Sequence, residues 1–124
     1  MPDSVINVLR QHKIKEAKII NENAIRLSLE DYDVDVKLFA AADCCSESWF
    51  EISGDLNDLV GKKITNINNT GEIDLPASNR QEYDKNHKYE MVFEDESTPF
   101  IFILRNSSNG YYSGWLEMKF KKKE

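Results

Sequence analysis

The sequence predicts an α+β domain that is mostly antiparallel β-sheet, with one short helix at the N-terminus and another near residues 54–60. Two observations support this fold class. Apolar and polar residues alternate along several short segments separated by turn residues, as in strands that keep one face in solvent. Helical spacing of apolar residues is confined to short segments. At 124 residues the chain can form one modest core, and we expect a single domain over residues 1–124.

The first third of the chain predicts a helix followed by a three-stranded meander. Ser4 is placed to cap a helix that ends at Gln11, in which Val5, Val8 and Leu9 share one face. Alternating patterns then predict strands at residues 14–22, 25–29 and 34–39, with turn chemistry between them.

The remaining segments predict a second β block. Gly61 ends the short helix near residues 54–60, and a strand follows over residues 62–70. The segment at residues 71–88 is polar and aperiodic, which predicts a long loop of the kind that is usually functional or disordered. Further strands are predicted at residues 89–93, 100–104 and 115–120, the second of them apolar on both faces as in a strand buried on two sides. Residues 121–124 are expected to form a frayed basic tail.

Charge and cysteine usage exclude several function classes. The net charge is −6, and the one dense basic run is Lys121-Lys122-Lys123, which disfavours general nucleic-acid binding. No apolar stretch approaches the roughly 20 residues that cross a membrane, and the N-terminus does not resemble a signal peptide, so we expect a cytoplasmic protein. Cys44 and Cys45 are adjacent and predict reduced thiols. No metal-ligand spacing is present, His12 and His87 stand alone, and no metal or cofactor is predicted.

The segment from Arg105 to Gly114 is the candidate binding site. It carries an arginine, two asparagines, three serines, two glycines and two tyrosines. A guanidinium can bind phosphate through two hydrogen bonds, amides and hydroxyls can address ribose or base edges, and tyrosines can stack on a base. The candidate ligand-binding residues in this segment are Arg105, Asn106, Ser108, Asn109, Tyr111 and Tyr112. The alternative is a purely structural β-hairpin, since Asn109-Gly110 is a favoured type I′ turn pair.

Two segments also resemble a known family. They are Asp43–Glu51, followed by Leu59-Val60-Gly61, and Arg105–Tyr112. Together they are similar to a DCCSESWFE…RNSSNGYYGG pattern of small uncharacterised proteins found largely in bacteriophages and prophages. This chain has Ser113 before Gly114 where the pattern has a second glycine, and residues 71–88 have no counterpart in it.

The resemblance implies a viral context. Small accessory phage proteins often act against host defence, and the phage Thoeris anti-defence proteins look similar in size and as compact homo-oligomeric domains. Those proteins sequester nucleotide-derived immune signals such as cyclic ADP-ribose isomers or cyclic oligonucleotides. By this resemblance the chain is expected to act in the host cytoplasm as a homo-oligomer.

Three functional hypotheses remain open at this level. The first is a non-catalytic protein that sequesters a nucleotide-derived signal, with Trp49, Ser46 and Arg26 as further ligand-binding candidates. Trp49 would stack or belong to the core, Ser46 would contact the ligand or donate locally, and Arg26 would face the ligand across a subunit interface. The second is an acidic inhibitor that binds a host defence effector such as a CRISPR nuclease. The third is an enzyme that uses the cysteines or the carboxylates, which ranks last because the sequence shows no base beside a nucleophile.

Overall fold

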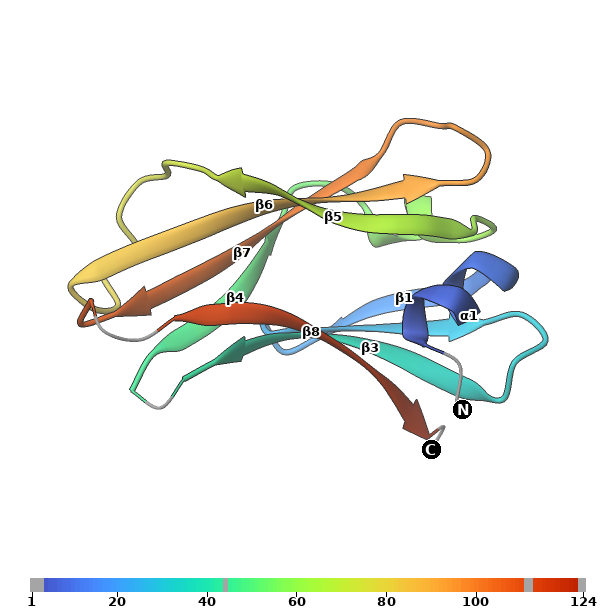
Figure 1. The fold of residues 1–124 in the computed structure, drawn as a ribbon, viewed down its shortest axis with the longest axis horizontal. Helices are drawn as coiled ribbons and strands as arrows, with labels where there is room; N and C mark the ends of the chain where they lie inside the picture. Colours follow the sequence, from blue (N-terminus) through green and yellow to red (C-terminus); the bar gives the residue numbers. More distant parts are fainter. Residues whose placement is uncertain (1–3, 44, 111–112, 123–124) are drawn as a thin grey trace.

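The computed structural model describes residues 4–43, 45–110 and 113–122. Within them the chain forms two four-stranded antiparallel sheets that stack face to face, with strand orders β1-β2-β3-β8 and β4-β7-β6-β5 (Figure 1). The strands of the first sheet are β1 (Ile14–Ile20), β2 (Ala24–Leu29), β3 (Val34–Ala42) and β8 (Gly114–Lys122). Those of the second are β4 (Glu47–Ile52), β5 (Ile64–Glu72), β6 (Tyr83–Phe93) and β7 (Phe100–Ser108). The prediction of a mostly antiparallel β domain is confirmed.

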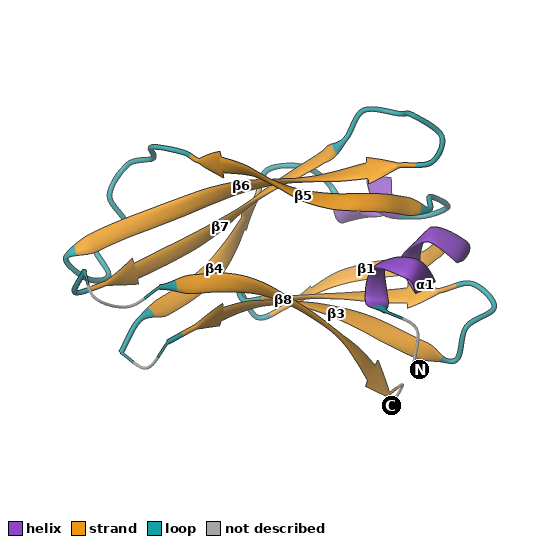
Figure 2. Cartoon of the chain, in the orientation of Figure 1, coloured by secondary structure: helices purple, strands orange, loops and turns teal. Residues whose placement is uncertain are grey.

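Two short helical segments lie at the same end of the two sheets (Figure 2). α1 spans Val5–Gln11, and its N-cap Ser4 accepts a hydrogen bond from the Asn7 N–H, so the predicted N-terminal helix is confirmed. η1 is a 3₁₀ turn at Leu56–Leu59 that Asp55 caps, slightly shorter than the predicted helix. None of the helices in the described part of the chain is both long and apolar enough to cross a membrane.

The predicted meander β1-β2-β3 is also confirmed. Its two tight turns each contain a residue with positive φ, Asn21 at 56° and Asp31 at 57°. Asparagine and aspartate tolerate this conformation better than most residues because their short polar side chains bond locally. The sequence signal for these turns therefore has a direct conformational cause.

The β7–β8 connection corrects the hairpin interpretation of Asn109-Gly110. β7 pairs with β4 and β6 in one sheet, whereas β8 pairs with β3 in the other. The chain therefore passes from one sheet to the other between Ser108 and Gly114. The β3–β4 connection at residues 43–46 crosses between the sheets as well. Gly110 has positive φ but Asn109 does not, so the predicted type I′ turn is not formed either, and strand pairing is decided by contacts far away in sequence.

Three predicted boundaries were also wrong. Arg105 to Ser108 belong to β7 and not to a loop. β6 starts at Tyr83 and β5 runs to Glu72, which shortens the predicted loop at 71–88 to residues 73–82. β8 extends to Lys122, so Lys121 and Lys122 are part of a strand, while residues 123–124 lie outside the described residues.

The apolar core lies between the two sheets and under α1. Phe102 of β7 is fully buried, and its ring lies 5.5 Å from that of Phe50 and 5.3 Å from that of Tyr89, centroid to centroid. Ile101 on the opposite face of β7 is 39% exposed. Over residues 100–104, β7 is therefore buried on its inner face and at least partly exposed on its outer face, which corrects the prediction of burial on both faces there.

Candidate functional site

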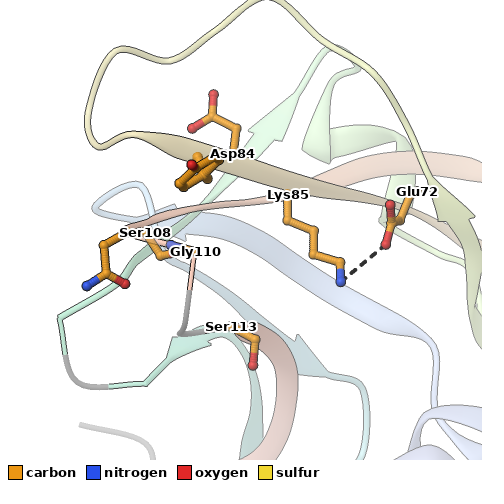
Figure 3. Close-up of a pocket in the computed structure, with 8 residues that line it drawn as sticks. Glu72, Asp84, Lys85, Ser108, Gly110 and Ser113 are labelled. Atoms are coloured by element: carbon orange, nitrogen blue, oxygen red, sulfur yellow. Dashed lines mark hydrogen bonds and ion pairs between the residues drawn. The ribbon is translucent and has the colours of Figure 1, made fainter.

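The inner faces of β6 and β7 change from apolar to polar along their length, and a cleft opens where they become polar. It lies at the end of the sheets opposite α1 (Figure 1) and has a volume of about 650 Å³ (Figure 3). Its lining residues are Glu72, Tyr83, Asp84, Lys85, Ser108, Asn109, Gly110 and Ser113. We call this site the cleft. Its size falls within the range of about 300–1,000 Å³ that is usual for small-molecule sites.

Lys85 and Glu72 form an exposed ion pair in the cleft. Lys85 Nζ lies 3.3 Å from Glu72 Oε1, and both side chains are more than half exposed. Figure 3 shows the Lys85 side chain reaching toward Glu72, while Asp84 points away from them. Such exposed pairs contribute little stability, so the ammonium can change partner at little cost.

Tyr83 and Gly110 form the outer part of the cleft. Tyr83 is 56% exposed, which is unusual for so large an aromatic side chain. Gly110 has φ of 101°, and a Cβ there would lie 3.1 Å from the Tyr83 ring. Its N–H donates to Ser108 Oγ at 3.0 Å. The glycine therefore allows the β7–β8 connection to turn closely against an exposed aromatic ring.

A smaller cavity of about 70 Å³ adjoins the cleft and shares Lys85 and Ser113 with it; its other lining residues are His87, Leu104, Asn106 and Gly114. Asn106 is 4% exposed. Its Nδ2 donates to Ser48 Oγ at 3.0 Å, to the Glu47 carbonyl at 3.2 Å and to Ser46 Oγ at 3.3 Å. Asn106 and Ser46 thus join β7 to β4, a structural role.

Gly114 is packed tightly against the same group of side chains. A Cβ at this position would overlap Ser48 Oγ and lie 2.7 Å from Asn106 Nδ2. No side chain fits at this position. Because Gly114 contacts both Ser48 and Asn106, the segments 43–51 and 105–112 meet in space around it. This packing accounts for the small polar residues Ser48 and Asn106 at the point where the two segments meet.

The two connections between the sheets are tied to each other at the rim of the cleft. The Asp43 N–H donates to the Ser113 carbonyl at 3.0 Å. Asp43 Oδ2 accepts from the Ser113 N–H at 3.2 Å and from its hydroxyl at 3.3 Å. These bonds fix Ser113 at the rim and hold the start of β8 against the end of β3.

Arg105 does not line the cleft, because it lies on the outer face of the sheet. Its guanidinium donates to the Pro76 carbonyl at 2.8 Å, to Asn86 Oδ1 at 3.2 Å and to Glu51 at 3.2 Å, and it lies 3.5 Å from Asp84. Its side chain is 11% exposed. Since four protein acceptors occupy this guanidinium, we do not retain Arg105 in the proposed site.

Residues 73–82, which we call the strap, cross the outer face of the second sheet above Arg105 (Figure 1). Arg80 of the strap lies over Trp49 at 3.7 Å from the ring centroid. It also forms two hydrogen bonds of 2.8 Å with Glu22 in the β1–β2 turn. Trp49 is consequently 7% exposed, and it faces away from the cleft.

Asp84 anchors the strap from β6. Burial opposes its ionisation, but hydrogen bonds from the Ser78 N–H and hydroxyl and from Ser107, together with the charge of Arg105, outweigh burial and lower the pKa of Asp84. The two bonds from Ser78 are both 2.7 Å long. The carboxylate is thus held in its charged form as a structural acceptor.

The remaining predicted residues are dispersed. Arg26 lies in the first sheet, paired with Asp35 at 2.8 Å, and donates to the Lys122 carbonyl at 2.9 Å. Tyr111 and Tyr112 lie outside the described residues. Of the predicted ligand-binding residues, Ser108 and Asn109 line the cleft, and Asn106 lines the adjoining cavity.

Sequence reasoning missed Tyr83, Lys85 and Glu72. All three were assigned to the long loop, because the end of β5 and the start of β6 are polar on both faces and their alternation is therefore not visible. The one signal available in the sequence was a tyrosine two residues before a lysine, at the spacing that places both side chains on one face of a strand.

The described residues thus define an antiparallel two-sheet protein with an open polar cleft at one end. The chain belongs to a family described as a domain of unknown function, DUF7448, whose model matches residues 7–118. It is also 53% identical over 103 residues to an uncharacterized protein of Acanthamoeba polyphaga mimivirus, covering 80% of this chain and 81% of that protein. No solved structure matches the chain. The relative is viral, in agreement with the viral context that the resemblance implied, whereas the phage signature stays a prediction.

Proposed function

We propose that the chain binds a small nucleotide-derived ligand in the cleft and sequesters it without altering it. The observation that carries this proposal is the meeting of an exposed aromatic ring, a lysine and a polar β7–β8 connection at one cleft, through Tyr83, Lys85 and residues 108–110. These groups match the three parts of a nucleotide, which are a flat base, a phosphate and a hydroxylated sugar.

Each group has a defined task in this proposal. The Tyr83 ring stacks on the base, since base–aromatic stacking contributes about 1–3 kcal/mol per base. The Lys85 ammonium binds phosphate after exchanging its exposed partner Glu72. Ser108, Asn109 and the carboxylate of Glu72 address sugar hydroxyls or the edge of the base.

Sequestration fits the cleft better than catalysis. Catalysis by a nucleophile needs an activating base within hydrogen-bond reach. The groups that line the cleft are hydroxyls, one amide, one phenol, one lysine and two carboxylates. One of these carboxylates, Asp84, has a lowered pKa, which makes it a weaker base. A viral relative and the phage resemblance favour an immune signal of the host as the ligand.

Thermal unfolding against a panel of nucleotides tests this proposal. ADP, cyclic ADP-ribose and cyclic dinucleotides are suitable probes, because a ligand that binds the folded state raises the midpoint of unfolding. Lys85→Gln and Tyr83→Ala should each abolish most of the shift. Lys88→Gln is the matched control, since Lys88 lies on the same strand with its side chain on the opposite face.

Ligand recovered by heating the complex should have an unchanged mass. A changed mass would identify an enzyme. The absence of any shift across the panel, or equal shifts in Lys85→Gln and wild type, would reject the cleft as a nucleotide site.

The net charge of −6 favours one alternative, an acidic inhibitor that occupies a basic groove of a host effector. Such an inhibitor should ignore the nucleotide panel and bind a protein partner in a salt-sensitive manner. Its binding would not depend on Tyr83.

A further inference from the structure

The described residues form four edge strands, and in three of them a bond from another segment, a bulge or a helix interrupts the free edge. An unprotected edge offers a row of free backbone N–H and C=O groups to any other strand. In β4 the Phe50 N–H donates to the Glu22 carbonyl at 2.7 Å. In β1, Ile14 donates to the Lys62 carbonyl at 2.9 Å and accepts from the Gly61 N–H at 2.7 Å.

β5 is protected in two further ways. Its pairing with β6 shifts register twice, between Ile64 and Asn66 and between Asn69 and Gly71, and bulges of this kind discourage pairing at an edge. α1 also packs against it, and Arg10 Nε donates to the Thr65 carbonyl at 2.7 Å.

β8 differs from the other three edges. Its pairing with β3 is continuous from Gly114 to Lys122 without a register shift. Apart from β3, no segment of the described residues makes a backbone–backbone hydrogen bond with residues 115–121. Trp115 is 41% exposed and Met118 is 37% exposed. A long, regular and partly apolar edge of this kind is the type that pairs with another strand.

We propose that β8 pairs antiparallel with β8 of a second copy of this chain, around a twofold axis at Met118. In this register Glu117 of each copy lies opposite Lys119 of the other, which gives two ion pairs of opposite charge. Leu116 lies opposite Phe120. A shift of one residue along each chain would instead place Glu117 opposite Glu117 or Lys119 opposite Lys119. Charge thus selects both the second copy as partner and the register.

The same register adds a positive charge to the cleft, a consequence that rests on the proposed function. Gly114 of one copy lies opposite Lys122 of the other, beside Ser113 at the rim of the cleft. Lys122 shares a strand face with Leu116 and Phe120, which pack against the core between the sheets. The second copy therefore directs Lys122 toward the side on which the cleft opens, where Lys85 is already paired with Glu72.

Sedimentation equilibrium of the full chain tests the pairing. We expect a species of twice the 14.4 kDa chain mass. Glu117→Lys and Lys119→Glu should each weaken the dimer by roughly tenfold or more, because each variant creates two like-charge contacts. Glu94→Lys, in the exposed β6–β7 turn, is the matched control and should leave the dimer unchanged.

Mixing the two variants makes the test specific. Glu117→Lys and Lys119→Glu chains carry like charges with themselves but complementary charges with each other, so a one-to-one mixture should restore a dimer. A wild-type monomer at all concentrations, capture of a different protein in place of a second copy, or a dimer that Glu117→Lys leaves intact would overturn the proposal.

Binding of ADP by the dimer tests the added charge separately. Lys122→Gln should keep the dimer and weaken ADP binding about tenfold, and equal affinity would overturn this consequence. A dimer that binds none of the nucleotide panel would reject the proposed function and support the β8 interface alone.

Discussion

The two ends of the stacked sheets are built from the same strands but have different chemistry. The inner face of β6 carries Phe93, Met91 and Tyr89 at the helical end and His87, Lys85 and Tyr83 at the open end. β7 follows the same order, from Phe100, Phe102 and Leu104 to Asn106 and Ser108. The alternation of side chains stays constant along each strand, while the residue type on the inner face changes.

This difference separates stability from binding. At the helical end α1 buries Val8 and Leu9 and η1 buries Leu59, so apolar contacts hold the sheets together there. At the open end the polar side chains bond within each sheet, Asn106 to Ser48 of β4 and Asp43 to Ser113 beside the ends of β3 and β8, and the cleft opens there. In the proposed function the polar end can take up a ligand because apolar contacts at the other end hold the fold.

Truncation of a core ring should produce the largest effect. Phe102→Ala removes a fully buried side chain that contacts Phe50 and Tyr89, and we expect it to lower the free energy of unfolding by about 3–5 kcal/mol. Tyr83→Ala at the open end should cost less than about 0.5 kcal/mol. Urea unfolding followed by circular dichroism measures both. Equal losses would contradict the separation of the two ends.

Removal of the polar junction should have an intermediate effect. Asn106→Ala leaves the Glu47 carbonyl and two serine hydroxyls without their donor, and we expect a loss of about 1–3 kcal/mol. Ser113→Ala, which removes one exposed hydroxyl bond, is the control and should cost less. If Asn106→Ala proved as stable as wild type, the open end would not depend on this junction.

The elements that sequence analysis found are those whose signal is local. Ser4 and the spacing of Val8 and Leu9 are sufficient for α1, and the alternation of β2 and β3 is visible because one face is apolar. β6 was shortened in the prediction because its residues 83–88 are polar on both faces. The separation of β7 and β8 into different sheets follows from pairings with strands distant in sequence, and near the crossing Gly114 approaches Ser48, 66 positions away.

The site was located only in part for the same reason. Ser108 and Asn109 were found because their composition is unusual for a loop. Arg105 and Trp49 were grouped with them, yet in a strand Arg105 and Ser108 point to opposite faces. The sequence segment had been read as one loop, in which this alternation does not apply. Tyr83 and Lys85 reach the cleft through pairing of β6 with β7, which no local pattern reveals.

Loss of the strap contact should have a smaller effect on stability and a clear optical signature. Arg80→Ala removes the cation over Trp49 and both bonds to Glu22, and we expect a cost of about 1 kcal/mol or less because the pair is exposed. In a Trp115→Phe background the remaining emission, from Trp49, should shift to the red as solvent reaches the ring. Arg80→Lys should give a smaller red shift than Arg80→Ala but not the wild-type spectrum, since a lysine keeps a positive charge but cannot form the two-bond contact with Glu22. An unchanged spectrum would show that the strap does not shield Trp49.

The smallest effect concerns acid stability, and it applies to the outer face alone. The folded-state pKa of Asp84 lies below its ordinary value of 3.8, so the folded state binds fewer protons than the unfolded state. Its contribution to stability is therefore complete above about pH 4 and is lost as the pH falls through the lowered pKa. Asp84→Asn should flatten this part of the pH profile of unfolding, measured between neutral and acidic pH by urea titration. Although Asp84 borders the cleft, its hydrogen bonds tie it to the strap, so nucleotide affinity, which the proposal assigns to Tyr83 and Lys85, should not follow the same profile. If both profiles changed together in Asp84→Asn, the strap and the cleft would be one coupled unit, and the independence of the outer face from the open end would be rejected.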